Sequence, residues 1–360
     1  MIYGANGYTG DLVARLAASR GSRPLLAGRN AGAVRALADE LGLDHVVFDL
    51  RDPAATRQHL AEVDVVAHCA GPFVATSGPM VQACLDTGTH YLDVTGEHPV
   101  FEAVLARDAD ARAAGVVLLT GAGFDVVPTD CLANLLHAAL PDATALELAF
   151  AAPGGLSRGT ATTGLAMNAK GGWRRIAGIL VPTPIGTPAR DVPFPSKVRR
   201  VGSVPWGDLV TAHHSTGIGD IVVYTRTAAP GLLQKLIRFG PVRALAARAI
   251  KRQPPGPSAE TRAATRCEVW GEVRNPAGEV RTATLTGPNA YDLTADAMHR
   301  AAEHLLAGTG GRAGGAVEPG AHTPATAFGP EFLAQLDRVV VSPPELGQPV
   351  GGDAEPSGGL

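Results

Sequence analysis

A glycine-rich turn near the start of the chain constrains the fold more than any other feature. Residues 4–10 read Gly-Ala-Asn-Gly-Tyr-Thr-Gly and stand between a short apolar run and an amphipathic one. In a strand–turn–helix unit, Gly4 permits the tight turn, Gly7 lets backbone amides approach a phosphate at the helix start, and Gly10 lets helix and strand pack closely. The spacing is GxxGxxG rather than GxGxxG, with the same physical role. The turn therefore predicts a dinucleotide-binding βα unit.

Short apolar runs alternate with amphipathic runs over the first third of the chain, which is the pattern of βα units and a parallel sheet. The expected strands are 2–3, 24–27, 46–48, 63–68, 91–94 and 116–119. The expected helices are 12–18, 33–41, 54–60, 80–86 and 101–114. We therefore predict an α/β fold with an N-terminal Rossmann-type doubly wound parallel sheet. The first strand is shorter than the usual five or six residues, which suggests a clipped or misassigned start.

The texture of the sequence changes after Pro128, where small and polar residues become frequent. Segments 154–172 and 182–205 are rich in Gly, Pro, Ser and Thr and predict long loops. Elements are expected as a helix at 131–139 and as strands at 146–150, 221–225, 266–273 and 280–285. The last two strands flank a turn sequence, Asn-Pro-Ala-Gly, and predict an antiparallel hairpin. We therefore predict a second, α+β lobe with a mixed or antiparallel sheet.

Three further segments lie in the second half of the chain. Residues 230–251 mix apolar and basic side chains, and a core-facing helical hairpin broken at Gly240 is favoured over a membrane-surface role. A helix is expected at 294–306 with Thr294 as its N-cap. The Gly/Pro-rich tail 342–360 is expected to be disordered.

Length and composition exclude several classes of protein. At 360 residues the chain exceeds one ordinary hydrophobic core, so two domains are expected. A net charge of −3 gives no electrostatic case for nucleic acid or anionic lipid. No apolar run approaches the roughly 20 residues that span a bilayer, and no signal peptide precedes the turn, so a soluble cytoplasmic protein with a small-molecule ligand is expected. No metal site is expected from the scattered cysteines Cys69, Cys84, Cys131 and Cys267.

An arginine after the second expected strand indicates which dinucleotide binds. Arg29 and Asn30 follow Ala-Gly at the place where an NAD site usually carries an acidic residue. An arginine there can pair with a 2′-phosphate, so Arg29 predicts NADPH/NADP+ as the cofactor. The alternative is a solvated arginine at a strand end. Asp49, after the third strand, is expected to accept a hydrogen bond from the adenine amino group, although Asp also begins turns.

The ends of the later strands should lie beside the nicotinamide and the substrate. Small residues after the fourth strand would admit the cofactor, and Gly96 and Asp125 follow the fifth and sixth. Asp93 and Glu97 could act as acid or base, but carboxylates at strand ends also cap helices.

Taken together, these segments resemble the saccharopine dehydrogenase-like family, including its trans-acting enoyl reductase branch. The stretches that carry the resemblance are GANGYTG, LAGRN, CAGPF, GPMVQACLDTGTHYLDVTGE, GAGFDVVPTD, SRGTATTG, GDL at 207–209, YDLTADA and GGAVEPGAHTPATAFG. The resemblance implies an NADP-binding Rossmann domain (1–127 and 287–341) interrupted by a substrate and dimerisation domain (128–286), and it implies a homodimer. The cofactor-binding residues that it implies, or that the turn predicts, are Gly4, Asn6, Gly7, Tyr8, Thr9, Gly10, Arg29, Asn30, Asp49, Ala70, Gly71, Pro72, Phe73 and Gly96.

The resemblance also implies a reductase, of conjugated C=C bonds as in the enoyl type or of C=N bonds as in the saccharopine type. We expect hydride delivery to a C=C bond of a lipid or natural-product intermediate. Imine reduction is the alternative, and a non-catalytic NADP(H)-binding sensor or scaffold is a third. No cluster of arginines suits a dicarboxylic amino acid, which argues against saccharopine itself.

The Tyr-x-x-x-Lys pair of short-chain dehydrogenases is absent, and the candidates for the proton donor are Lys170, His213, Tyr291 and Asp125. Lys170 stands in an expected glycine-rich loop and could donate to an enolate or simply face solvent. His213 and His214 would point in opposite directions on a strand, so at most one faces the cleft. Tyr291 and Asp125 complete the set.

Overall fold

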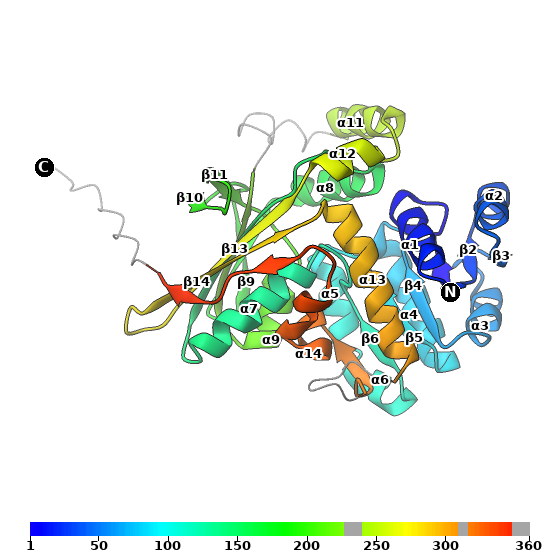
Figure 1. Cartoon of the computed structure of the whole chain (residues 1–360), viewed down its shortest axis with the longest axis horizontal. Coiled ribbons are helices and arrows are strands. Elements are labelled where there is room, and N and C mark those ends of the chain that lie inside the picture. Colours follow the sequence, from blue (N-terminus) through cyan, green and yellow to red (C-terminus); the bar gives the residue numbers. More distant parts are fainter. Residues whose placement is uncertain (227–239, 309–315, 348–360) are drawn as a thin grey trace, which may run out of the picture.

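Two β-sheets form the framework of the protein in the computed structural model (Figure 1). The structure describes residues 1–226, 240–308 and 316–347. In the colours of Figure 1, the blue and cyan start of the chain forms most of the first sheet and its helices, and the green and yellow middle forms most of the second sheet. The orange helix α13 and a late strand return to the first sheet.

The first sheet has seven parallel strands in the order β15-β6-β5-β4-β1-β2-β3. These strands are β1 (Ile2–Tyr3), β2 (Leu26–Gly28), β3 (His45–Val47), β4 (Val65–His68), β5 (His90–Asp93), β6 (Val117–Leu119) and β15 (Gly320–His322). The helices around it are α1 (Tyr8–Ser19), α2 (Ala31–Leu41), α3 (Pro53–Leu60), α4 (Phe73–Thr87), α5 (His98–Leu105), α6 (Asp108–Ala114) and α13 (Ala290–Leu306). The prediction of a doubly wound parallel sheet is confirmed.

Alternating side chains on each strand explain why helices cover both faces of this sheet. Ile2 and Leu92 belong to a core on one face, whereas Tyr3 and Tyr91 belong to a second core on the other. Successive residues of a strand point to opposite faces, so a strand with no polar position must be buried on both sides. Helices α1 and α13 pack together over one face, and α3, α4 and α5 form a row over the other.

The second sheet is mixed and has ten strands, with β10-β11-β12-β7-β13-β14-β16 as its main path. Its strands are β7 (Ala145–Ala151), β8 (Gly172–Ile176), β9 (Ile179–Thr183), β10 (Ala189–Pro193), β11 (Val198–Ser203), β12 (Asp220–Thr225), β13 (Cys267–Arg274), β14 (Val280–Gly287), β16 (Val340–Val341) and β17 (Glu345–Leu346). The remaining helices are α7 (Val127–Ala139), α8 (Arg158–Lys170), α9 (Asp208–Thr216), α11 (Gly240–Arg252), α12 (Ala259–Ala264), α14 (Pro324–Phe328) and the 3-10 helix η2 (Pro330–Gln335). The expected hairpin is confirmed as β13 and β14.

One hydrophobic core continues from the first sheet into the second. It begins with Ile2 and Leu26 beneath α1, passes through Leu132 and Leu136 of α7, and reaches Val269 of β13. Buried apolar surface of this kind is the dominant stabilising contribution in folding. The two sheets are therefore joined by packing and not only by the chain.

The prediction of long loops in the second lobe was wrong. Segment 154–172 contains α8, and segment 182–205 contains the whole antiparallel hairpin β10–β11. Helix α8 lacks an apolar stripe because it is built mainly from Thr, Ala and Gly, so its sequence shows no helical periodicity. Strand β10 ends with Pro193, which an edge strand tolerates because no partner needs that N–H.

The late helix and the tail also differ from expectation. Helix α13 begins at Ala290, and its N-cap is Asn289, whose side chain accepts from the Tyr291 amide. Thr294 lies inside the helix, where its hydroxyl donates to the Ala290 carbonyl. The expected disorder from residue 342 is contradicted at β17, which pairs with β14, and both β16 and β17 belong to the second sheet rather than the first.

Two other expectations need adjustment. The helix expected at 101–114 is two helices, α5 and α6. Of the hairpin expected at 230–251, residues 240–251 lie in α11, and 230–239 lie outside the described residues, as does the tail 348–360. Among the helices of the described ranges, none is long and apolar enough to cross a membrane.

Candidate functional site

A cavity of about 940 Å³ lies at the ends of the first-sheet strands and is closed on its other side by α8. Segments from both lobes line it. The lining residues are Gly4, Asn6–Thr9, Arg29, Asn30, Asp49, Arg51, Cys69–Phe73, Val94, Gly96, Glu97, Asp125, Ser157–Thr160, Thr162–Gly164, Met167, Trp206 and Pro255. Carboxyl ends of parallel strands are the usual ligand site of an open α/β sheet. Thirteen of the fourteen expected cofactor residues are in this set, and Gly10 is not.

The glycine turn is fitted to a phosphate by its backbone. Gly7 is the N-cap of α1, and no side chain caps this helix end. The first amides of a helix have no acceptor within the helix, and the helix dipole makes this end favourable for an anion. A Cβ on Gly10 would lie 2.3 Å from the Gly4 carbonyl oxygen, so only glycine permits α1 to start so close to β1. The turn therefore has the shape and the free donors that a dinucleotide pyrophosphate needs.

The ends of β2 and β3 form the far side of the same cavity. Arg29 and Asn30 directly follow β2, and the Asn30 side chain caps α2 by accepting from the Ala33 amide. Asp49 follows β3, and Arg51 binds its carboxylate with Nε and Nη2. A carboxylate engaged in this way is a poorer acceptor for an adenine amino group than the sequence suggested.

The segment after β4 contacts the carboxylate of Glu97, for which the sequence allowed either an acid/base role or a helix-capping role. Ala70, Gly71 and Pro72 line the cavity and lead into α4. The buried Glu97 carboxylate accepts from the Phe73 amide at 3.1 Å and the Val74 amide at 3.1 Å, which are the first amides of α4. Glu97 thus fills the anion site at the start of α4, so its negative charge is held in place by the helix.

Asp93 ties strand ends together and does not line the cavity. Its fully buried carboxylate accepts from the Gly121 amide at 2.7 Å and from the Tyr91 hydroxyl at 2.7 Å. Burial raises the pKa of Asp93 to about 6, against these hydrogen bonds. The arrangement fixes β5 to the loop after β6, a structural task.

Asp125 is the expected proton donor that does line the cavity. It lies in the loop between β6 and α7, and a Cβ on Gly96 would be 3.1 Å from its Oδ2, so Gly96 leaves room for it. Burial raises the pKa of Asp125 to about 7, opposed by a hydrogen bond from Trp206. A carboxyl with such a pKa can hold a proton at neutral pH and release it.

A second buried carboxyl lies close to Asp125. Asp208, in the Gly-Asp-Leu motif at the start of α9, is fully buried, and neither of its Oδ atoms has a clear hydrogen-bond partner. Burial, together with the charges of Asp130 and Asp125, raises the pKa of Asp208 to about 8. At neutral pH this carboxyl is therefore mostly protonated.

The structure places the three other expected donors differently. Lys170 is the last residue of α8 rather than part of a loop, and its side chain lies outside what the structure describes. His213 is on α9 and not on a strand, and its Nδ1 is 2.8 Å from the Ile218 carbonyl oxygen, away from the cavity lining. The Tyr291 hydroxyl accepts from the Ser157 amide at 2.6 Å and lies 3.2 Å from the Thr160 hydroxyl. Tyr291 therefore supports the start of α8.

The second-lobe wall was missed by reasoning from sequence patterns. Residues 157–160 and 162–164 line the cavity with hydroxyl groups, an arginine and backbone, together with Met167 and Trp206. The Thr163 hydroxyl is 3.3 Å from the Glu97 carboxylate, so α8 also contacts the start of α4. The motif SRGTATTG carries a resemblance but predicts no site by itself, because nothing in its composition indicates a helix facing a cofactor.

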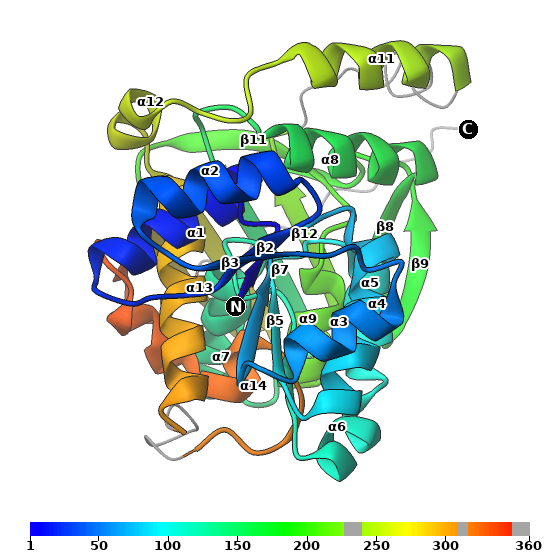
Figure 2. The ribbon, with the colours of Figure 1, turned by 90° about the vertical axis from the view of Figure 1, so that its right-hand side faces the viewer.

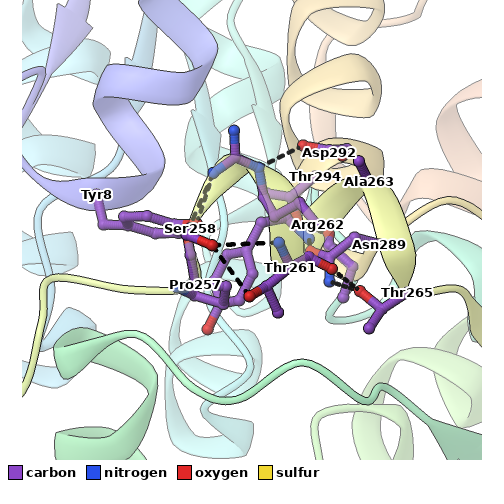
Figure 3. A network of polar contacts seen from close by, with 12 residues as sticks. Tyr8, Pro257, Ser258, Thr261, Arg262, Ala263, Thr265, Asn289, Asp292 and Thr294 are labelled. Atoms are coloured by element: carbon purple, nitrogen blue, oxygen red, sulfur yellow. Dashed lines mark hydrogen bonds and ion pairs between the residues drawn. The ribbon is translucent and has the colours of Figure 1, made fainter.

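A polar network joins the glycine turn to the second lobe (Figure 3). The Tyr8 hydroxyl donates to the Pro257 carbonyl at 2.6 Å and accepts from Arg262 Nη1 at 3.0 Å. Arg262 Nε in turn donates to Asp292 of α13 at 2.8 Å. We call Tyr8, Pro257, Arg262 and Asp292 the clasp, because it holds α1, α12 and α13 together beside the cavity.

Comparisons with known proteins identify relatives of the part of the chain that carries the glycine turn. Residues 1–119 match the family model of the saccharopine dehydrogenase NADP binding domain. A trans-acting enoyl reductase of Mycobacterium ulcerans is 32% identical over 145 residues, which are 38% of this chain and 35% of the relative. A saccharopine dehydrogenase-like oxidoreductase of Mus musculus is 27% identical over 152 residues, 36% of this chain and 35% of the relative. The matches thus span about a third of the relatives' own length.

The whole fold also has a solved counterpart. Saccharopine dehydrogenase (L-Glu forming) from Saccharomyces cerevisiae superimposes with a TM-score of 0.60 over 95% of this chain and 99% of that chain. At 14% identity the likeness concerns the fold. The domain match concerns the N-terminal third of the chain, which carries the glycine turn. Residues 1–119 are thus similar to a saccharopine dehydrogenase NADP binding domain, and the chain shares the saccharopine dehydrogenase fold.

Proposed function

We propose that this protein is an NADP(H)-dependent oxidoreductase that reduces a conjugated C=C bond of an enoyl- or enone-type lipid or natural-product intermediate. NADPH, when bound, supplies the hydride. The free amides at the start of α1 would hold the pyrophosphate, and Arg29 would pair with the 2′-phosphate. The rest of the cavity, bounded by α8 and Trp206, is available to the acceptor.

The observation that carries the proposal is the Asp125 carboxyl in the same cavity as the glycine turn. Reduction of a conjugated C=C bond adds a hydride at one carbon and leaves negative charge that a proton must neutralise. With its pKa raised to about 7 by burial, the Asp125 carboxyl is protonated in a large fraction of molecules at neutral pH. It can therefore supply that proton, and solvent can return it.

The charge of the second-lobe wall favours an acceptor without carboxylates. Arg158 is the one cation among the described residues that line this wall, and its Nε donates to the Gln253 carbonyl at 2.6 Å. Glu97 and Asp125 are acidic and line the same cavity, where Glu97 accepts from Thr163 of α8 and Asp125 accepts from Trp206. A dicarboxylic acceptor would meet carboxylates with few cations, at an electrostatic cost. Acyl or ketone groups meet no such cost.

The acidic residues of the cavity also favour imine reduction, which is the second candidate. A protonated imine carries positive charge, which an ionised Asp125 or the fixed Glu97 carboxylate would attract. In that reaction Asp125 would stabilise the cationic acceptor rather than donate a proton. The two reactions therefore require opposite protonation states of Asp125, so the pH dependence separates them.

The test has a binding stage and a turnover stage. NADPH fluorescence is titrated with the protein first, and then enones, enoyl thioesters and cyclic imines are screened for NADPH oxidation. We expect oxidation with enones or enoyl thioesters whose rate falls as pH rises through about 7, because Asp125 loses its proton. Oxidation of imines alone would favour the second candidate. Tight NADPH binding without oxidation of any acceptor would favour a sensor or scaffold.

A variant assigns the proton donor. Asp125→Asn preserves size and the hydrogen bond from Trp206 but cannot donate an acidic proton, so we expect unchanged NADPH affinity and about a hundredfold lower turnover. Asp191→Asn, an exposed residue of β10, is the matched control and should behave as wild type. Full turnover by Asp125→Asn would remove Asp125 from the mechanism.

A further inference from the structure

The ends of β2 and β3 bring a second arginine to the side of the cavity where Arg29 lies. The two strands are paired in parallel, with Gly28 opposite Val47. Arg29 directly follows Gly28, and Asp49 comes two residues after Val47, so the two lie at neighbouring strand ends. Arg51 follows Asp49 after one residue, and all three line the cavity.

Arg51 is held by Asp49 in a defined geometry. Its Nε donates to both oxygens of Asp49 at 3.1 Å, its Nη2 donates to Oδ2 at 2.7 Å, and its backbone amide donates to Oδ1 at 2.9 Å. A bidentate pair of this kind fixes the plane of the guanidinium. The Arg51 side chain is nevertheless 86% exposed, so its remaining donors are free toward the cavity and solvent.

The contact has little value as a stabiliser of the fold, since exposed ion pairs contribute almost nothing. The main effect of the contact is that it orients the Arg51 guanidinium. Arg29 has no hydrogen bond or ion pair within the described part of the chain, yet it lies close enough for its charge to act on Asp49. Hydrogen bonds from Arg51, with a smaller contribution from the charge of Arg29, lower the pKa of Asp49 to about 2. This corner therefore holds two cations and one fixed anion.

We propose that Arg29 and Arg51 together bind the 2′-phosphate of NADP(H), with Asp49 as the residue that positions Arg51. This inference rests on the NADP(H) function proposed above and adds a specificity-determining residue to it. Two arginine forks offer paired donors to a phosphate carrying close to two negative charges. It replaces the adenine contact expected for Asp49, since the Asp49 oxygens are taken by Arg51.

Binding of cofactor fragments tests the proposal without any substrate. Adenosine 2′,5′-bisphosphate carries the 2′-phosphate, and adenosine 5′-monophosphate lacks it. In calorimetric titration, Arg51→Ala should bind the bisphosphate at least about tenfold more weakly than wild type, because one charge-assisted contact is lost. Binding of the monophosphate should change less than about twofold. Equal losses for both ligands, or no loss for either, would overturn the proposal.

A double variant separates direct binding from simple shielding of Asp49. If Arg51 only neutralised Asp49, then Arg51→Ala with Asp49→Asn would bind the bisphosphate like wild type, which would contradict the proposal. If Arg51 binds the phosphate itself, the double variant stays weak. Arg57→Ala, an arginine on α3 outside the cavity lining, is the matched control and should bind both fragments normally.

The outcomes for the cofactor and for Arg51 are distinguishable. A wild-type protein that binds neither NADPH nor the bisphosphate would refute the proposed function. A wild-type protein that prefers NADPH over NADH, with a preference unchanged in Arg51→Ala, would refute only the role of Arg51.

Discussion

The two walls of the cavity are built by different physical means. The wall made by the glycine turn is backbone pressed against backbone, as at Gly10, where a Cβ would fall 2.3 Å from the Gly4 oxygen. The wall made by α8 is held by hydroxyl hydrogen bonds from distant parts of the chain, such as Tyr291 on α13 (Figure 2 shows α8 and α13 around the strands). The first wall tolerates almost no change of shape, whereas the second can change its side chains and keep its backbone. A cofactor common to many proteins suits the first wall, and a variable acceptor suits the second.

The comparison is tested most severely at Gly10. In Gly10→Val the new side chain must displace the Gly4 carbonyl or the start of α1, and we expect a loss of about 3 kcal/mol or more in the free energy of unfolding. Urea unfolding followed by circular dichroism measures it. Gly78→Ala, in α4 with open space around it, is the control and should be neutral or slightly stabilising. A mild effect at Gly10 would show that the first wall is not rigid.

The buried acid Asp208, at the start of α9, gives a pH-dependent effect. The folded-state pKa of Asp208 is raised to about 8, above the ordinary value, so the folded state binds more protons than the unfolded state between about pH 4 and 8. This group's contribution to stability is full below about pH 4 and is lost as pH rises toward 8. Asp208→Asn removes this loss, and we expect its free energy of unfolding to exceed that of wild type by about 2 kcal/mol at pH 9.

The measurement for Asp208 is a series of urea unfolding curves from pH 5 to pH 9. The gap between variant and wild type should widen with pH and then level off. Asp191→Asn, exposed on β10, should follow the wild-type curve. A gap independent of pH would contradict a raised pKa at Asp208.

Tyr291→Phe isolates the hydrogen bonds of the second wall. Removing the hydroxyl leaves the Ser157 amide without its acceptor, and we expect a loss of about 1–2 kcal/mol in stability. Amide hydrogen exchange should increase at the start of α8 and stay unchanged in α1. Tyr224→Phe, on β12 away from the cavity lining, is the control and should leave amide exchange at the start of α8 unchanged. Faster exchange in α1 as well would mean that the two walls are not independent.

The smallest effect is expected at the clasp in Figure 3, which joins the walls. Arg262→Ala removes the ion pair with Asp292 and the hydrogen bond to Tyr8, both partly exposed, so stability should fall by at most about 1 kcal/mol. NADPH affinity should weaken a few-fold because Tyr8 loses a partner that orients it. Arg266→Ala, whose guanidinium contacts only nearby backbone oxygens among the described residues, should leave the affinity unchanged.

The sequence predicts the first wall better than the second, because the first depends on local backbone packing and the second on contacts between distant residues. Gly4 to Gly10 satisfy steric requirements within one βα unit, and such local requirements leave a readable pattern of residues. The alternation of Ile2 and Tyr3 between two cores is likewise local and predicted the doubly wound sheet. Helix α8 depends on contacts with Tyr291 and Glu97, which are far away along the chain, and its own residues show no periodicity.

The errors at single residues have similar causes. His213 was expected on a strand, yet it lies on α9, which packs against α7. Asn289, and not Thr294, caps α13, since both residue types are good caps and only the packing decides between them. The raised pKa of Asp125 comes from burial beneath a second lobe that no local motif describes.

The core shared by both sheets has a consequence for how the molecule opens. Because the apolar cluster runs without a break from Ile2 to Val269, separating the lobes would expose it to water. A hinge between the sheets is therefore costly, and heat should unfold both in one calorimetric transition. Entry and release of a nucleotide must then depend on local movements. The short connection between α11 and α12, which touches the cavity through Pro255, contributes no residue to that core.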